Sequence, residues 1–242
     1  MERLRYFVMT NLARIPAAAL PLARLRGEGV VVDASTELVV ESFPRCASSF
    51  ALAALNLAQE PRRLRVAHHT HTPANALRGI RLQIPTLVLV RDPEDVTVSN
   101  MIRHPQRTPN DVLRGFLRFY EPLLRHRRDL VVGTFEEVVG SEMGLITKRL
   151  NARFGTTFEE FEATEENVAR CLREIDEDWR RRRGGGERLE RIVPRPSEAR
   201  DRLKVEQRER FRSEASPELL RRAERVYAAL VRSEAGAAGP AG

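Results

Sequence analysis

Two hydrophobic patterns alternate along this chain, one typical of strands and the other of helices. Short apolar runs predict buried strands at residues 37–42, 64–67, 85–90 and 130–133. Longer amphipathic segments predict helices at 48–59, 92–103, 111–127, most of 136–154, and 217–232. Strands that alternate with helices indicate an α/β fold, with a mostly parallel sheet covered by helices on both faces.

The two ends of the chain differ from this pattern. Residues 1–27 mix apolar and basic groups, and Pro16 and Pro21 interrupt the apolar part. A signal peptide needs an unbroken apolar centre, so we expect a helical segment packed on the domain, with membrane-surface binding as the alternative. Residues 28–232 then form a single domain, and the Ala/Gly/Pro-rich residues 233–242 form a disordered tail. We expect no transmembrane segment and a cytoplasmic location.

Charge adds a second clue. The 242 residues include 41 basic ones and carry a formal net charge of +7, and all the basic residues except Lys148 and Lys204 are arginines. A GC-rich genome accounts for such a bias, and an anionic ligand, such as a nucleotide, a sulfated sugar or a nucleic acid, is the other interpretation. With only two cysteines, Cys46 and Cys171, a disulfide scaffold and a four-cysteine metal site are excluded.

The first strand-to-helix turn, residues 43–49, has the composition of an anion cradle. Small residues at 46–49 let backbone N–H groups curl around an anion, and the following helix N-terminus adds unpaired donors and a favourable dipole. Arg45 adds a cation, and Ser48 and Ser49 add hydroxyl donors. The turn contains no glycine and lacks the Walker A spacing, and a plain helix cap is the other interpretation of the serines.

The second strand-to-helix turn begins at Arg91, directly after the predicted strand 85–90. Asp92 suits a helix cap and Pro93 the first helical position, which are structural roles. Arg91 itself lies at the carboxyl end of the strand, where ligands of parallel sheets lie. Arg91 and Ser99 together can hold a second phosphate, although Arg91 can also pair with a carboxylate of its own helix.

Three of the five histidines, His68, His69 and His71, lie close together before Pro73. A metal site is not favoured, because no Cys, Asp or Glu stands nearby and the proline excludes a helical His-x-x-x-His arrangement. A histidine at a strand end beside a phosphate cradle is well placed to act as a general base. A structural role is the alternative for His68 and His69.

Four segments resemble, in order and spacing, the motifs of sulfotransferases that use 3′-phosphoadenosine 5′-phosphosulfate (PAPS). Residues 42–50 (SFPRCASSF) are similar to the family's 5′-phosphosulfate loop, and residues 70–73 (THTP) to its Thr-His-x-Pro segment. Residues 91–99 (RDPEDVTVS) are similar to its 3′-phosphate motif, and residues 134–137 (TFEE) to its Tyr-Glu-Asp segment. The resemblance implies a small, bacterial-type member with a three-layer α/β/α, P-loop NTPase-like sulfotransferase fold.

The resemblance also implies roles for individual residues. His71 is then the catalytic base, and Arg45 stabilises the leaving phosphate. The implied donor-binding residues are those of the loop, the 3′-phosphate motif, the adenine position and a basic C-terminal segment: Arg45, Cys46, Ala47, Ser48, Ser49, Arg91, Ser99, Phe135 and Arg195, with Ser197 beside the last.

The chain departs from the family pattern at several of these positions. Ala47 replaces the loop glycine and Cys46 the usual serine; both are small, so the cradle can survive if Ala47 keeps a negative φ. His69 stands where many members carry lysine, and Phe135 lacks the tyrosine hydroxyl. The family's C-terminal Arg-Lys-Gly clamp is absent, and the basic segment 191–204 lies in the corresponding place.

The implied reaction is sulfuryl transfer from PAPS to a hydroxyl or amine of a small-molecule or carbohydrate acceptor, with no metal and no nucleic-acid partner. We expect the acceptor pocket in loops within residues 1–36, 104–110 and 156–192. One alternative is a P-loop-type kinase, which calls for a Gly-Lys-Ser/Thr that the chain lacks. The other is a non-catalytic protein that binds nucleotide or nucleic acid, consistent with the arginine excess.

Overall fold

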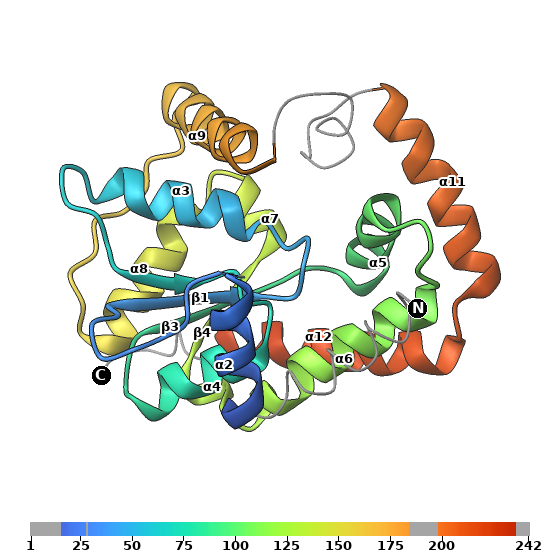
Figure 1. Cartoon of the computed structure of the whole chain (residues 1–242), viewed down its shortest axis with the longest axis horizontal. Helices are drawn as coiled ribbons and strands as arrows, with labels where there is room; N and C mark the ends of the chain where they lie inside the picture. The colour runs from blue at the N-terminus through green and yellow to red at the C-terminus, as the bar shows by residue number, and fades with distance from the viewer. Residues whose placement is uncertain (1–15, 28, 184–197, 236–242) are drawn as a thin grey trace.

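A parallel sheet forms the centre of the computed structural model, which describes residues 16–27, 29–183 and 198–235 (Figure 1). The four-stranded sheet has the order β2-β1-β3-β4. Every neighbouring pair of strands is parallel. The strands are β1 (Leu38–Ser42), β2 (Val66–His68), β3 (Thr86–Val90) and β4 (Val131–Thr134). The α/β class predicted from the apolar runs is therefore confirmed.

Helices cover both faces of the sheet. Figure 1 shows α3 (Ser48–Ala58) and α9 (Glu165–Arg183) on one side. It shows α2 (Pro16–Arg26), α4 (Pro73–Arg81), α6 (Pro109–Leu124) and α12 (Pro217–Ala235) on the other. The remaining helices are α5 (Pro93–Arg103), η1 (Arg127–Asp129), α7 (Phe135–Val139), α8 (Met143–Phe154) and α11 (Glu198–Glu214). The result is a three-layer α/β/α arrangement whose core includes all of β1 and β3 apart from three polar residues, Glu41, Ser42 and Thr86.

Three helices were not predicted from the sequence. α4 is only nine residues long and buries small residues such as Ala74, Ala76 and Gly79, while its larger apolar residues, Leu77 and Ile80, are only partly buried. α9 and α11 are rich in charged residues, and α9 occupies much of the segment where we expected an acceptor loop. The predicted helix over 136–154 is divided at Gly140, whose extended backbone ends α7.

Helices lie near both ends of the described chain. α2 lies against α4, with Ala19, Leu20 and Ala23 buried beside Ala74. Residues 1–15 lie outside the described part of the chain. α12 continues through residues 233–235, where we expected the tail.

The strand order places a ligand site at one edge of the sheet. β1 connects through α3 to β2 on one side, whereas β2 connects through α4 to β3 on the far side of β1. The connection therefore reverses direction between β1 and β3, and parallel sheets bind ligands in the crevice at such a point, beyond the carboxyl ends of the strands. Ser42 and Val90 end these two strands, so both predicted phosphate-binding turns lie at this edge.

Candidate functional site

The turn after β1 contains two residues with left-handed backbone, Arg45 with a φ of 82° and Ala47 with a φ of 63°. Ala47 therefore does not meet the condition of a negative φ that was set for survival of the cradle. Ala47 is the N-cap of α3, and its left-handed conformation turns the loop into the helix. Glycine adopts this conformation without steric cost, which accounts for its place in the related loop. Here the chain reaches the same kind of turn with an alanine.

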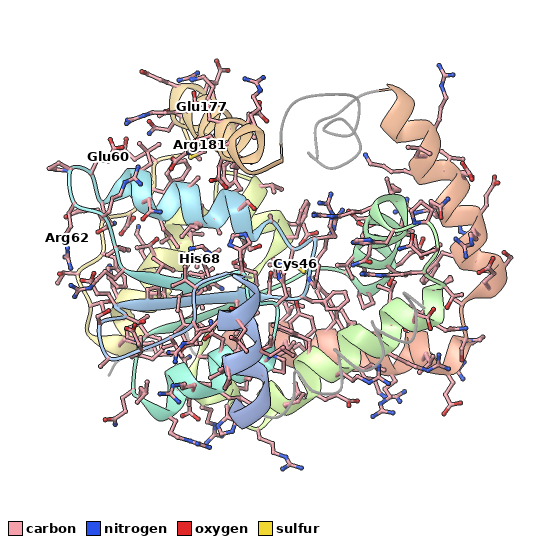
Figure 2. All side chains as sticks on the ribbon, in the orientation of Figure 1. Cys46, Glu60, Arg62, His68, Glu177 and Arg181 are labelled. Carbon is pink, nitrogen blue, oxygen red and sulfur yellow. The ribbon has the colours of Figure 1, made fainter. Side chains whose placement is uncertain are left out.

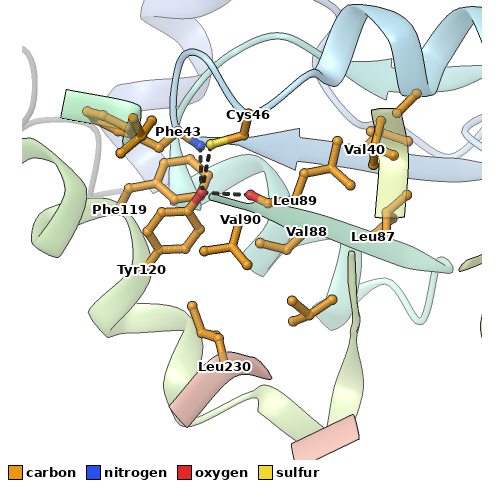
Figure 3. Close-up of a cluster of buried hydrophobic side chains, with 14 of the residues drawn as sticks. Val40, Phe43, Cys46, Leu87, Val88, Leu89, Val90, Phe119, Tyr120 and Leu230 are labelled. Atoms are coloured by element: carbon orange, nitrogen blue, oxygen red, sulfur yellow. Dashed lines mark hydrogen bonds between the residues drawn. The ribbon is translucent and has the colours of Figure 1, made fainter. Parts of the chain in front are cut away.

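A buried tyrosine holds this turn against the sheet (Figure 3). The hydroxyl of Tyr120, from α6, donates a hydrogen bond to the carbonyl of Leu89 at 2.6 Å and accepts one from the backbone N–H of Phe43 at 3.3 Å. The Cys46 Sγ atom lies 3.5 Å from the same hydroxyl. Burial raises the pKa of the Cys46 thiol to about 12, so Cys46 is a neutral packing residue and can contribute only its backbone to a ligand.

Ser48 and Ser49 open helix α3 but do not cap it, because Ala47 is the N-cap and the cap has no side-chain hydrogen bond. Their hydroxyls instead point to one imidazole. The His69 Nε2 atom lies 3.1 Å from Ser49 Oγ and 3.4 Å from Ser48 Oγ. The capping alternative is thus wrong for these serines, and the structure brings His69, at the position of the family's lysine, onto the predicted cradle.

The second turn is organised by its own helix start. The Asp92 carboxylate caps α5 by accepting from the Asp95 N–H at 3.0 Å, as predicted. Arg91 lies 3.8 Å from the Asp95 carboxylate, so the alternative pairing within its own helix does occur. The Arg91 guanidinium also stacks over the Phe135 ring at 3.8 Å and lies 3.5 Å from the Arg45 carbonyl. These contacts join the starts of α5 and α7 to the first turn.

A side-chain hydrogen bond links the two predicted phosphate sites directly. The Arg45 Nε atom donates to Ser99 Oγ at 3.1 Å, and the Ser99 side chain is buried on α5. The Nε atom of Arg91 is buried without a hydrogen-bond partner in the described part of the chain. Two guanidinium groups and a serine hydroxyl therefore gather at the crevice between β1 and β3, as an anion-binding site requires.

His71 follows β2 in a strained turn, with a φ of 50°, and His69 has a φ of 58°. The His71 Nδ1 atom lies 2.9 Å from the Ser42 carbonyl. Because a carbonyl oxygen can only accept, Nδ1 carries the hydrogen in this contact and the neutral ring has its lone pair on Nε2. In this tautomer, Nε2 can take a proton from a hydroxyl or amine group of a bound molecule.

The neighbouring imidazoles form a pair. The Nδ1 atoms of His68 and His69 are 2.7 Å apart, so one of them donates and the other accepts. The His69 ring also packs edge-to-face against His71, with centroids 5.7 Å apart. A chain of contacts thus runs from the pair to the serines of the cradle and to His71. Cys46 is fully buried, whereas His68 is half-buried; both are labelled in Figure 2.

Glu41 was not singled out in the sequence. It is fully buried in β1, directly before Ser42, and its carboxylate accepts from Thr70, His71 and Asn75. Burial raises the pKa of Glu41 to about 7, although the hydrogen bonds oppose this shift. The sequence signal was present, because a single acidic residue inside an apolar run is a buried polar group that needs partners.

Arg208 is a second residue that the sequence did not reveal. It lies on α11 and forms an ion pair with Glu94 at 3.1 Å and another with Asp95, which also faces Arg91. α11 has a nearly uniform charged pattern, which offers no way to single out one arginine. The candidates Arg195 and Ser197 lie outside the described residues.

Within residues 16–27, 29–183 and 198–235, no group of three or more His, Cys, Asp or Glu side chains is arranged to hold a metal ion. In the same part of the chain, no helix has the length and apolar character needed to cross a membrane.

Comparison with known proteins gives limited information. No known family and no curated protein matches the chain. A solved structure to which the chain is similar is that of mouse sulfotransferase SULT7A1 complexed with PAP, with 14% identity and a TM-score of 0.44. The match covers 85% of this chain and 88% of that chain. The functional interpretation therefore rests on the residues of this chain.

Proposed function

We propose that this protein is a PAPS-dependent sulfotransferase, which transfers a sulfuryl group to a hydroxyl or amine of a small-molecule or carbohydrate acceptor. The observation that carries the proposal is the hydrogen bond between Arg45 and Ser99. It joins the segments that resemble the family's 5′-phosphosulfate loop and 3′-phosphate motif. The bond lies at the crevice where a parallel sheet binds its ligand.

The donor would be held mainly by positive charge and backbone donors. Arg45, the N–H groups of Cys46 and Ala47, and the serines at the start of α3 would bind the 5′-phosphosulfate. Arg91 and Ser99 would bind the 3′-phosphate, and the unpaired Nε of Arg91 is a donor suited to that anion. Phe135, which stacks on Arg91, would lie beside the adenine.

In the proposed reaction, the acceptor oxygen or nitrogen attacks the sulfur atom of PAPS in line with the bridging oxygen. Its proton passes to Nε2 of His71. The bond between sulfur and the bridging oxygen breaks, and 3′,5′-adenosine bisphosphate (PAP) leaves with the negative charge. Arg45 and the hydroxyls of Ser48 and Ser49 stabilise that charge as it develops. The scheme uses no metal ion.

His69 has a supporting role in this proposal. Its Nε2 atom contacts both cradle serines, so it orients the hydroxyls that face the leaving group. When protonated, the imidazole also supplies a cation at the position where many family members carry lysine.

Calorimetric titration with PAP, in magnesium-free buffer and with ATP as the control, tests the donor site. We expect micromolar or tighter binding of PAP and a clear preference over ATP, because only PAP carries the 3′-phosphate that Arg91 and Ser99 would bind. A folded protein that binds neither nucleotide contradicts the proposal. A second titration with added magnesium tests the kinase alternative, which is favoured if ATP then binds in preference to PAP.

A further inference from the structure

The Glu41 carboxylate lies at the centre of a buried hydrogen-bond network beneath His71. Its Oε1 atom accepts from the Thr70 N–H at 3.0 Å, the Thr70 hydroxyl at 2.7 Å and the Asn75 side-chain amide at 2.9 Å. Its Oε2 atom accepts from the His71 N–H at 3.1 Å. Donors from the turn after β2 and from α4 therefore converge on one side chain of β1.

This network stabilises a backbone conformation that is unfavourable by itself. His69 and His71 both have positive φ, a conformation that side chains other than glycine rarely adopt. Such residues persist only where their surroundings hold them in place. Glu41 accepts hydrogen bonds from the backbone N–H groups of Thr70 and His71, and these bonds hold the turn in its conformation. The position of the backbone in turn sets where the His71 ring lies.

Asn75 extends the network to the other side of the turn. Its side-chain carbonyl accepts from the Val32 N–H at 2.9 Å, and its amide also donates to the Val30 carbonyl at 3.2 Å. Glu41 is therefore braced by α4 and by residues 30–32 as well as by its own strand. A braced carboxylate defines the position of the His71 N–H more closely than a side chain on the surface can.

We propose that Glu41 is a positioning residue for His71, and that its carboxylate holds the turn so that the His71 Nδ1–H stays on the Ser42 carbonyl. The lone pair is thereby kept on Nε2. The catalytic meaning of this arrangement rests on the proposed function, whereas the arrangement itself does not. Glu41 touches no reacting atom in this scheme and acts through His71.

The division of donors between the two carboxylate oxygens gives a selective test. In Glu41→Gln, we expect the side-chain oxygen to keep the Oε1 position, where three donors converge. The reverse orientation would place the amide NH₂ group, itself a donor, against all three of them. In the expected orientation, the amide nitrogen faces the His71 N–H, and two donors meet. The substitution thus disrupts the contact with His71 and leaves those with Thr70 and Asn75.

Thr70→Val is the matched control, because it removes the hydroxyl donor to Oε1 and leaves the contact of Oε2 with the His71 N–H. Glu41→Asp is a second test variant, since it keeps the charge but withdraws the carboxylate by one methylene group. It keeps the proposal testable if Glu41→Gln does not fold. The probe is long-range ¹H–¹⁵N NMR of the imidazoles, with the His71 signals assigned by a His71→Gln variant.

At pH 8 or above, where Glu41 is mostly ionised, we expect the His71 ring nitrogens of the wild-type protein to show one fixed tautomer, with hydrogen on Nδ1. Glu41→Gln and Glu41→Asp are expected to move the two nitrogen signals toward each other, as in an imidazole that exchanges between tautomers. Thr70→Val is expected to keep the wild-type pattern. Wild-type signals in folded Glu41→Gln, or an equal change in Thr70→Val, overturn the proposal.

PAP titration of the same proteins separates this proposal from the proposed function. Glu41 accepts hydrogen bonds from Thr70, His71 and Asn75, so PAP affinity in Glu41→Gln should stay within about twofold of the wild-type value. A tenfold or larger loss would make Glu41 a support of the donor cradle and overturn its assignment to His71. If wild-type protein binds no PAP, the proposed function fails, and the NMR pattern still decides the role of Glu41.

Discussion

At the scale of single residues, Arg91 makes the most varied contacts of the site. It faces Asp95, stacks on Phe135 and approaches the Arg45 carbonyl, while its side chain remains only 18% exposed. A guanidinium held in this way is pre-ordered for an anion, because little rotamer freedom is lost on binding. Its removal should therefore affect ligand binding more than an exposed arginine would.

Arg91→Ala is expected to weaken PAP binding by about 1.5–3 kcal/mol, the range for a charge-assisted contact with phosphate. Calorimetry gives the affinity. Arg222→Ala is the control, since Arg222 pairs with Glu121 on the outer surface of α6 and α12, and it should leave PAP affinity unchanged. Equal affinities for wild type and Arg91→Ala would place the 3′-phosphate elsewhere.

His71→Ala tests the proposed base. Turnover of PAPS with an acceptor is expected to fall by roughly 10²–10⁴, the contribution of a general base, while PAP binding stays nearly intact. The check is a comparison of kcat with the calorimetric Kd for PAP. Normal turnover in the variant would remove His71 from the mechanism, and lost PAP binding would assign it to the donor site instead.

Ala47→Gly tests the left-handed turn of the cradle. A side chain with a φ of 63° costs roughly 1–2 kcal/mol, and glycine relieves this cost while losing more chain entropy on folding. We expect a net stabilisation of about 0.5 kcal/mol, measured by urea unfolding. Ala51→Gly, inside α3, should instead destabilise by about 1 kcal/mol. Equal destabilisation by both substitutions would show that the left-handed conformation of Ala47 is not strained.

At the scale of elements, the site depends on how α6 packs against the carboxyl ends of β1 and β3. Tyr120 on α6 joins the Phe43 N–H of the first turn to the Leu89 carbonyl of β3 (Figure 3). Phe43 also packs edge-to-face on Phe116 and Phe119 of the same helix. The helix thus fixes the height of the cradle above the sheet.

Tyr120→Phe is expected to destabilise the protein by about 1–3 kcal/mol, because it leaves buried backbone groups without their hydroxyl partner. It should also weaken PAP binding, since the turn loses its link to β3. Leu113→Ala on the same helix is the control, with a comparable loss of stability and no loss of PAP affinity. Urea unfolding measures the loss of stability, and calorimetry measures the loss of PAP affinity. Equal losses of PAP affinity in both variants would contradict a specific role of the Tyr120 hydroxyl in holding the turn.

At the scale of the whole molecule, the buried Glu41 makes stability depend on pH. Burial raises its pKa to about 7 in the folded protein, above the ordinary glutamate value of 4.5. The folded state therefore binds the proton more tightly, so the contribution of this group to stability is full below pH 4.5 and is lost as pH rises through 7.

Between about pH 5 and pH 8, wild-type protein should lose about 2–3 kcal/mol of unfolding free energy relative to Glu41→Gln, which does not titrate. Urea unfolding of both proteins across this range gives the difference, in which the titration of other groups cancels to first order. A difference that is constant with pH would show that Glu41 has the same pKa in the folded and unfolded chain.

The strands and most helices at the site could be predicted because each has a strong local pattern. The β-branched run ending at Val90 is apolar throughout, and Asp92-Pro93 marks the following helix start through local chemistry alone. α4 and α11 have weaker signals: α4 is short and buries small residues, and most residues of α11 are charged. For the same reason, Arg208 could not be distinguished from the other arginines of its segment.

The sequence by itself determined the α/β class, the two turns at the ends of β1 and β3, and the residue types of the cradle. These follow from local periodicity and from short-range chemistry. Only the tertiary structure decided that Arg45 reaches Ser99, that Tyr120 holds the turn, and that Glu41 lies under His71. Such contacts join residues far apart in the chain, and the strand order and helix packing that bring them together leave no local signal.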